Sequence, residues 1–339
     1  MGGDYRKPPP VSLGHLAAEL RPVDGGDAYE IVRIVEGDPW DSTADSPLNA
    51  VGVQAKVGER IVAVNGQPVS RERPPQSLLV HQAKTKVDVA LRAADGASSR
   101  NVLVTTLADE VPARYREWVE RNRSLVHARS EGRVGYLHLP DMMSAGFAEF
   151  HRYFGSECDS DALIVDLRYN RGGHVSQLLL EKVARRRIGY DLTRWGQPEP
   201  YPMESPAGAV VALTNEHAGS DGDIFSHCFK LMKIGPLLGT RTWGGVIGIN
   251  PRHKLVDGTE TTQPEYSFWF TDVGFAVENY GTDPDMEVDN APQDARAGRD
   301  RQLDAALDVA LDLAKSATKP AFGERPLLRR NALPPRGGG

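Results

Sequence analysis

Short apolar runs separated by turn residues fill the first third of the chain. The clearest of them lie at residues 29–35, 60–64, 87–91 and 101–105. The segments between them carry turn signals such as Gly37-Asp38-Pro39 and Asn65-Gly66. Runs of this length with such turns predict β-strands. We therefore expect a small β-rich domain over residues 11–107, with one short helix at 76–84, after a flexible leader of residues 1–10.

From about residue 108 onward, longer apolar runs alternate with helical patterns. Continuous apolar runs at 161–167 and 209–213 are typical of strands buried on both faces of a sheet. A further strand is predicted at 133–139, and helices are predicted at 113–130, 144–154, 175–187 and 221–232. This alternation favours βαβ units around a parallel sheet. The expected fold class is therefore α/β over residues 108–316, followed by a disordered tail at 317–339.

Composition and charge exclude several classes of protein. The chain has 339 residues, of which 25% are charged, and a formal net charge of -6. This balance is too mild to indicate a nucleic acid or an anionic membrane as partner. No apolar run reaches the ~20 residues that span a bilayer, and the first residues lack the apolar core of a signal peptide. Two cysteines cannot build a disulfide framework, and no metal or cofactor motif is present. We expect a cytoplasmic protein without a cofactor.

Ser220 lies where a predicted buried strand passes into a predicted helix. Its neighbours in Ala218-Gly219-Ser220-Asp221 are small, which would let a reacting carbonyl approach its hydroxyl. The first N–H groups of the helix would point toward this position and suit an oxyanion. The alternative is an ordinary helix N-cap, with Asp221 and Asp223 as favourable charges in the first turn. On this stretch alone, the N-cap is the better explanation.

Three more residues are candidates for the same site, each with an ordinary structural alternative. Gly173, which ends Asn170-Arg171-Gly172-Gly173, could offer its N–H to an oxyanion or could simply form a glycine turn. Glu278 could orient a base or hold substrate, or could be a solvent-facing charge. Asp191 follows a basic run and could select a basic substrate side chain or form a surface ion pair. None of the nine histidines has a spacing that identifies a general base.

The order of the motifs is more specific than any one of them. Residues 34–69, with Val57-Gly58-Glu59-Arg60-Ile61, are similar to the PDZ modules of the tail-specific serine peptidase family. Residues 163–173 and Gly281-Thr282-Asp283-Pro284-Asp285 resemble the catalytic domain of that family. The stretches 215–221 and 239–248 are similar to its tricorn-like branch. The resemblance covers most of the chain.

This resemblance implies a PDZ domain followed by a crotonase-like α/β spiral that hydrolyses peptides. Ser220 matches the position of the family's nucleophile, and Glu278 matches its orienting glutamate. The backbone N–H groups of Asp221 and Gly173 would form the oxyanion hole. Asp191 matches an acidic residue of the substrate pocket that favours basic side chains. Relatives in the tricorn-like branch form hexamers, so we expect self-association, with peptides from bulk protein degradation as substrates.

The general base is the one departure from the family pattern. Other branches use a lysine after the nucleophile, but Lys230, Lys233 and Lys254 do not fall in that motif. The tricorn-like branch uses a histidine upstream of the PDZ domain, at a position that would lie before Met1. We therefore expect this chain alone to be inactive or weakly active.

Two other classes of protein stay open. The chain could be a catalytically incomplete scaffold whose PDZ domain holds a peptide C-terminus through the loop Ser12–Leu16. A crotonase-type acyl-CoA enzyme would share the expected fold, although the PDZ segment and Gly219-Ser220-Asp221 argue against it.

Overall fold

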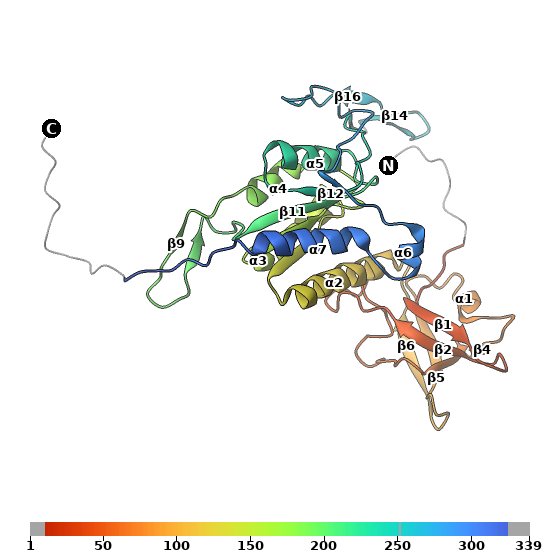
Figure 1. Ribbon diagram of the computed structural model, residues 1–339. Helices are drawn as coiled ribbons and strands as arrows, with labels where there is room; N and C mark the ends of the chain where they lie inside the picture. The colour runs from red at the N-terminus through yellow and green to blue at the C-terminus, as the bar shows by residue number, and fades with distance from the viewer. Residues whose placement is uncertain (1–10, 251, 325–339) are drawn as a thin grey trace, which may run out of the picture.

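The computed structural model describes residues 11–250 and 252–324, and these form two units with separate hydrophobic cores (Figure 1). The predicted leader and the end of the predicted tail, residues 325–339, lie outside the described residues. Arg33 and Arg152 join the two units through ion pairs of 2.6 Å with Glu117 and Asp38, respectively.

The N-terminal unit is an antiparallel sheet with the strand order β1-β2-β3-β5-β6, and β4 pairs with β3. Its strands are β1 (Ala18–Pro22), β2 (Tyr29–Ile34), β3 (Arg60–Val64), β4 (Gln67–Pro68), β5 (Lys86–Arg92) and β6 (Ser99–Thr105). Alternate side chains of β5, namely Val87, Val89 and Leu91, are fully buried because successive residues of a strand face opposite sides. The β-rich prediction for this part of the chain is confirmed.

The predicted helix at 76–84 is much shorter in the structure, where α1 covers only Pro75–Leu78. The residues after it pair instead with the loop Ser12–Leu16. Gly14 N–H donates to the Leu79 carbonyl at 2.8 Å, and His81 N–H donates to the Ser12 carbonyl at 2.6 Å. His15 N–H donates to the Leu107 carbonyl at 2.9 Å. Because these donors are used inside the unit, the structure weakens the prediction that this loop holds a peptide carboxylate.

The second unit contains a parallel sheet with the strand order β17-β12-β11-β8-β7. Its strands are β7 (Val134–His138), β8 (Ala162–Asp166), β11 (Ala209–Thr214), β12 (Leu237–Gly239) and β17 (Met286–Glu287). Its helices are α2 (Val111–Ser130), α3 (Ser144–Glu157), α4 (Ser176–Val183), α5 (Asp221–Leu231), α6 (Pro292–Arg296) and α7 (Arg301–Ala314). Strands β7, β8, β11 and β12 follow one another across the sheet in chain order. Because crossovers between parallel strands are right-handed, the helices α3, α4 and α5 that connect these strands lie on the same face of the sheet. Helix α7 packs across the other face (Figure 1).

Two excursions leave this unit. The helix predicted to reach residue 187 ends at Val183, and the chain continues into the hairpin of β9 (Gly189–Asp191) and β10 (Glu199–Tyr201). This hairpin projects from the body of the unit (Figure 1). The second excursion pairs β13 (Gly248–Ile249) with β16 (Pro264–Tyr266), and β14 (His253–Lys254) with β15 (Glu260–Thr261). Such short strands carry too little pattern to be predicted from the sequence.

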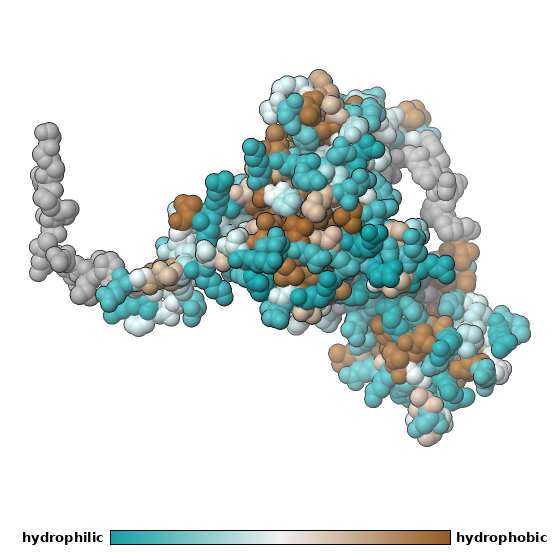
Figure 2. Space-filling model, viewed as in Figure 1, coloured by the Kyte–Doolittle hydropathy of each residue, from teal (hydrophilic) through white to brown (hydrophobic). Residues whose placement is uncertain are grey.

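The surface of the molecule is mixed. On the face shown in Figure 2, apolar side chains gather over the N-terminal unit and also form patches among the hydrophilic side chains of the second unit. Across the described ranges, every helix is too short or too polar to cross a membrane.

Candidate active site

Ser220 joins β11 to α5 in a strained backbone conformation. Its φ of 55° and ψ of -118° are unusual for a residue with a side chain, and such strain costs ~1–3 kcal/mol. Ser220 occupies the N-cap position of α5, yet its hydroxyl makes no capping hydrogen bond within the described residues. Ser220 therefore holds the N-cap position without the capping hydrogen bond that the ordinary alternative requires. A strained turn between a strand and a helix is also how other hydrolase folds present a nucleophile.

The loop after β8 packs directly against this turn. A Cβ on Gly172 would lie 2.5 Å from the Cβ of Ser220 and 3.1 Å from the nitrogen of Asp221. A Cβ on Gly173 would lie 1.9 Å from the carbonyl oxygen of Met142. Both glycines also have positive φ values, of +74° and +152°, so only glycine fits at these positions.

Beside Ser220, the backbone N–H groups of Gly173 and Asp221 have no hydrogen-bond acceptor among the described residues. The neighbours of Gly173 are bonded: Met142 N–H donates to the Gly172 carbonyl at 2.8 Å, and His174 N–H donates to the Met142 carbonyl at 2.7 Å. Asp221 begins α5, where the first N–H groups of a helix have no partner within it. Both N–H groups are therefore available to an incoming oxygen atom.

The carboxylates of Asp221 and Asp223 are buried, and each holds a different loop. Asp221 accepts hydrogen bonds from the N–H and hydroxyl of Ser176 at 3.0 and 2.5 Å. Asp223 accepts from the N–H groups of Gly244 and Gly245 at 2.8 and 3.4 Å, and burial raises the pKa of its carboxyl. The interpretation of these residues as helix-terminal charges was thus incomplete, because both face the protein interior.

Asn170 links the loops after β8 and β11, although the sequence did not single it out for a role. It is fully buried, and its side-chain oxygen accepts from Gly172 N–H at 2.9 Å. Its backbone carbonyl accepts from Gly219 N–H at 3.0 Å, and its side-chain nitrogen donates to the Leu139 carbonyl at 2.8 Å. The only available signal was its position in the Asn-Arg-Gly-Gly motif.

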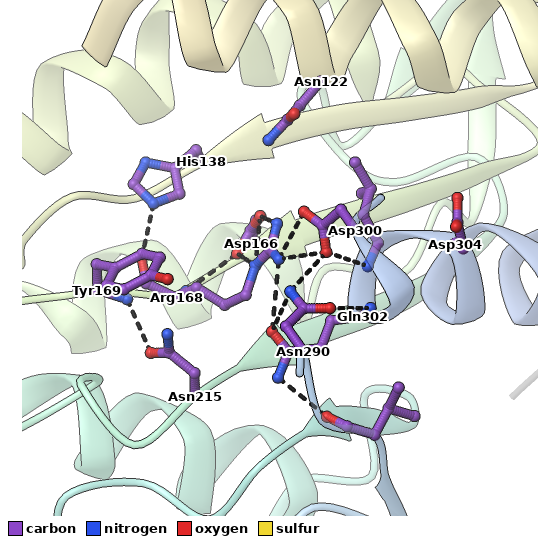
Figure 3. A network of polar contacts seen from close by, with 12 residues as sticks. Asn122, His138, Asp166, Arg168, Tyr169, Asn215, Asn290, Asp300, Gln302 and Asp304 are labelled. Atoms are coloured by element: carbon purple, nitrogen blue, oxygen red, sulfur yellow. Dashed lines mark hydrogen bonds and ion pairs between the residues drawn. The ribbon is translucent and has the colours of Figure 1, made fainter. Parts of the chain in front are cut away.

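A buried polar network stabilises the start of the loops that follow β8 and β11 (Figure 3). The guanidinium of Arg168 pairs with Asp166 at 2.7 Å and with Asp300 at 2.8 Å. The Arg168 carbonyl accepts from the His138 ring at 2.8 Å, while Tyr169 N–H donates to the side chain of Asn215 at 3.0 Å. The network therefore ties the carboxyl ends of β7, β8 and β11 to the start of α7.

A cavity of about 670 Å³ lies on the loop of Trp243, and Ser220 is not among its lining residues. Trp243 forms one wall and is 65% exposed, and a Cβ on Gly219 would lie 2.8 Å from its indole ring. Tyr280 and Arg241 line the cavity as well. The cavity is large enough for a peptide side chain.

Glu278 and Asp191 form no hydrogen bond with Ser220 among the described residues. The Glu278 carboxylate accepts from the N–H groups of Val246 and Ile247 at 2.6 and 2.8 Å, so it shapes the loop that follows Trp243. Asp191 is exposed on the projecting hairpin β9–β10, and no contact joins it to Ser220.

The described histidines beside the Ser220 and Gly173 motifs in the sequence contact other residues. His217 stacks on Tyr169, and His174 lies 3.5 Å from the hydroxyl of Tyr266. No histidine or lysine of the described residues is hydrogen-bonded to Ser220. In the same residues, no group of three or more His, Cys, Asp or Glu side chains is arranged to hold a metal ion.

Comparison with known proteins identifies the family. The profile of Peptidase family S41 matches residues 133–288, and the profile of the Tricorn protease PDZ domain matches residues 14–109. Tricorn protease homolog 1 of Streptomyces coelicolor is 49% identical over 293 residues, which are 86% of this chain and 27% of that protein. The Tricorn protease homolog of Saccharolobus solfataricus is 49% identical over 89% of this chain and 28% of its own length. The chain belongs to the tricorn protease family.

The crystal structure of the tricorn protease matches 90% of this chain with a TM-score of 0.85 and 44% sequence identity. The match covers 29% of that structure's chain, so this sequence spans less than a third of the length of these relatives. The resemblance stated from the motifs is therefore confirmed: the chain combines a tricorn PDZ segment with an S41 serine peptidase segment in a mixed α/β fold.

Proposed function

We propose that Ser220 is the nucleophile of a tricorn-type serine peptidase site. Its oxygen attacks the carbonyl carbon of a peptide bond, and its proton passes to a base and then to the leaving amine. The N–H groups of Gly173 and Asp221 bind the negative oxygen of the tetrahedral intermediate, at ~3 kcal/mol of barrier for each donor. The observation that carries this proposal is the strained turn of Ser220, with a free hydroxyl beside two unpaired N–H groups.

The general base in this proposal comes from outside the described residues. The support is that no described histidine or lysine reaches the hydroxyl of Ser220. Without a base the hydroxyl stays protonated at neutral pH, so residues 11–324 alone would turn peptides over slowly.

The remaining predictions continue as proposals. Glu278 would orient active-site groups through the loop of Val246 and Ile247, which it holds. Asp191 would select basic side chains of the substrate. The boundaries 11–107 and 108–316, the crotonase-type course of the second unit, cytoplasmic location, peptides from bulk protein degradation as substrates and assembly into hexamers are proposed on the family resemblance alone.

The alternative functions have less support. A peptide-binding scaffold needs free donors in the loop Ser12–Leu16, but the N–H groups of Gly14 and His15 are already bonded. Membership of a peptidase family disfavours an acyl-CoA enzyme.

Acylation by an activated ester tests the nucleophile directly, because p-nitrophenolate leaves without the proton that a leaving amine requires. We expect the chain to release a burst of p-nitrophenol from a p-nitrophenyl ester, and Ser220→Ala to lose the burst. Ser226→Ala is the matched control, since Ser226 is a buried serine on α5 that bonds the Gly222 carbonyl at 2.8 Å. Equal bursts from the wild type and Ser220→Ala would rule out Ser220 as the nucleophile.

Added imidazole tests where the base comes from. If no described residue serves as the base, free imidazole should raise the acylation rate of the wild type and leave Ser220→Ala unchanged. Fast peptide turnover without imidazole that disappears in His174→Ala or His217→Ala would contradict the proposal.

A further inference from the structure

Ser176 and Asp221 join the starts of two neighbouring helices. Ser176 begins α4, Asp221 begins α5, and each residue is only 5% exposed. One oxygen of the Asp221 carboxylate accepts the Ser176 N–H at 3.0 Å, and the other accepts its hydroxyl at 2.5 Å. The carboxylate has no cationic partner and no other hydrogen bond among the described residues, so Ser176 alone accounts for its buried position.

This contact connects the two unpaired N–H groups of the site. Asp221 carries one of them on its backbone, and Gly173 carries the other, three residues before Ser176. One carbonyl fixes the segment between Gly173 and Ser176. The N–H groups of His174 and Val175 both donate to the Met142 carbonyl, at 2.7 and 3.1 Å. A short, fixed path therefore leads from the Asp221 side chain through Ser176 to the N–H of Gly173.

Asp223 shows that the direction of the Asp221 side chain is specific. Both aspartates lie in the first turn of α5, and both are at most 5% exposed. Asp223 faces the loop with Gly244 and Gly245, whereas Asp221 faces α4. A carboxylate that merely favoured the helix N-terminus could lie in solvent, so burial against Ser176 indicates a positional role.

We propose that Ser176 is a positioning residue that sets the spacing of the two oxyanion donors through the Asp221 carboxylate. The proposal rests on the function proposed above. Oxyanion donors act mainly on the charge that develops in the transition state. Their displacement should therefore slow acylation and leave substrate binding unchanged.

The experiment compares Ser176→Ala and Ser176→Thr with the control Ser226→Ala in the full chain, using the p-nitrophenyl ester. We expect Ser176→Ala to lower the limiting acylation rate roughly tenfold, with the ester concentration for half-maximal rate unchanged. Ser176→Thr keeps the hydroxyl and should stay within about twofold of the wild type. Ser226→Ala should react like the wild type even where its urea midpoint falls as far as that of Ser176→Ala.

Two outcomes of the ester assay overturn the proposal, and they can be told apart. A Ser176→Ala rate equal to that of Ser226→Ala, in a protein whose burst depends on Ser220, removes the positioning role alone. Equal bursts from the wild type and Ser220→Ala remove the proposed function, and the oxyanion role of Ser176 with it. Amide hydrogen exchange of residues 171–176 then reports on the contact itself: faster exchange in Ser176→Ala than in Ser226→Ala supports it, and equal exchange excludes it.

Discussion

Gly172 shows how little space separates the two loops of the site. Its missing Cβ would overlap the Cβ of Ser220 at 2.5 Å and approach the Gly219 carbonyl oxygen at 2.8 Å. The overlap involves atoms next to the backbone, which cannot rotate away as the end of a long side chain can. Ser220 can therefore occupy its position only because residue 172 has no Cβ atom.

We predict that Gly172→Ala abolishes the burst from the activated ester. Gly66→Ala is a close control, because φ is +71° at Gly66 and +74° at Gly172, while a Cβ on Gly66 meets nothing within 4 Å. Both variants should lose ~1–2 kcal/mol of unfolding free energy from the left-handed backbone, as measured in urea. The overlap with Ser220 adds to this loss only in Gly172→Ala, and a wild-type burst from that variant would refute the claim.

At this scale the sequence singled out Ser220, the proposed nucleophile, but not the contacts that hold its loop. Ser220 and Gly173 stood out through the ordered motifs of the family resemblance, because the local pattern alone favoured an N-cap and a glycine turn. Asp221 and Asp223 looked like ordinary first-turn charges, since their partners Ser176 and Gly244 lie far away in the sequence. Only the fold brings those donors to the carboxylates.

At the scale of elements, Arg168 joins the end of β8 to the start of α7. Its side chain is 2% exposed and lies between Asp166, which is fully buried, and Asp300. Asp300 also caps α7 by accepting from Leu303 N–H at 3.0 Å. A buried guanidinium is tolerated only while its carboxylate partners remain, because burial removes it from water.

Asp166→Asn is therefore expected to destabilise the second unit by ~3–5 kcal/mol, since it leaves the charge of Arg168 only partly compensated. Glu181→Gln removes an exposed carboxylate of α4 that pairs with Arg185, and should cost ~1 kcal/mol or less. Urea unfolding of both variants measures the difference. Similar losses would show that the buried pair contributes no more than a surface one.

The sequence predicted the buried strands and the amphipathic helices because their patterns are long. It failed at element ends that tertiary contacts decide. Helix α1 stops at Leu78 because the next residues pair with the loop at 12–16, and α4 stops at Val183 before a hairpin.

At the scale of the whole molecule, two cores meet through a small apolar cluster. Ala17, Val35, Leu107 and Ala113 form this cluster, and each is at most 6% exposed. The ion pairs of Arg33 and Arg152 flank the same junction and bind the PDZ segment to α2 and α3. Neither the cluster nor the ion pairs could be predicted, because their members come from separate domains of the sequence.

The stability of the second unit should depend on pH through His138. This ring is buried between the Tyr115 hydroxyl and the Arg168 carbonyl, and burial lowers its pKa. The unfolded side chain has the ordinary pKa of about 6.5, so below that pH the unfolded chain binds a proton that the folded chain does not. The free energy of unfolding should therefore fall as pH falls below about 6.5, by up to ~1.4 kcal/mol per pH unit.

His138→Gln keeps a donor for the Arg168 carbonyl and cannot titrate. Urea unfolding at pH 7.5 and pH 5.5 should show a smaller loss of stability for this variant than for the wild type, where the two pH values are chosen about one unit either side of the histidine pKa. An identical loss would show that His138 does not contribute to acid sensitivity.

The position of α7 has a consequence for the timing of synthesis. This helix covers one face of the sheet, and its first residues supply Asp300 to Arg168, but it is the last element that the described chain provides. A ribosome releases the turn of Ser220 long before the residues of α7. The nascent chain therefore carries an exposed serine on an uncovered sheet, and the site acquires its final geometry only after the helix has emerged.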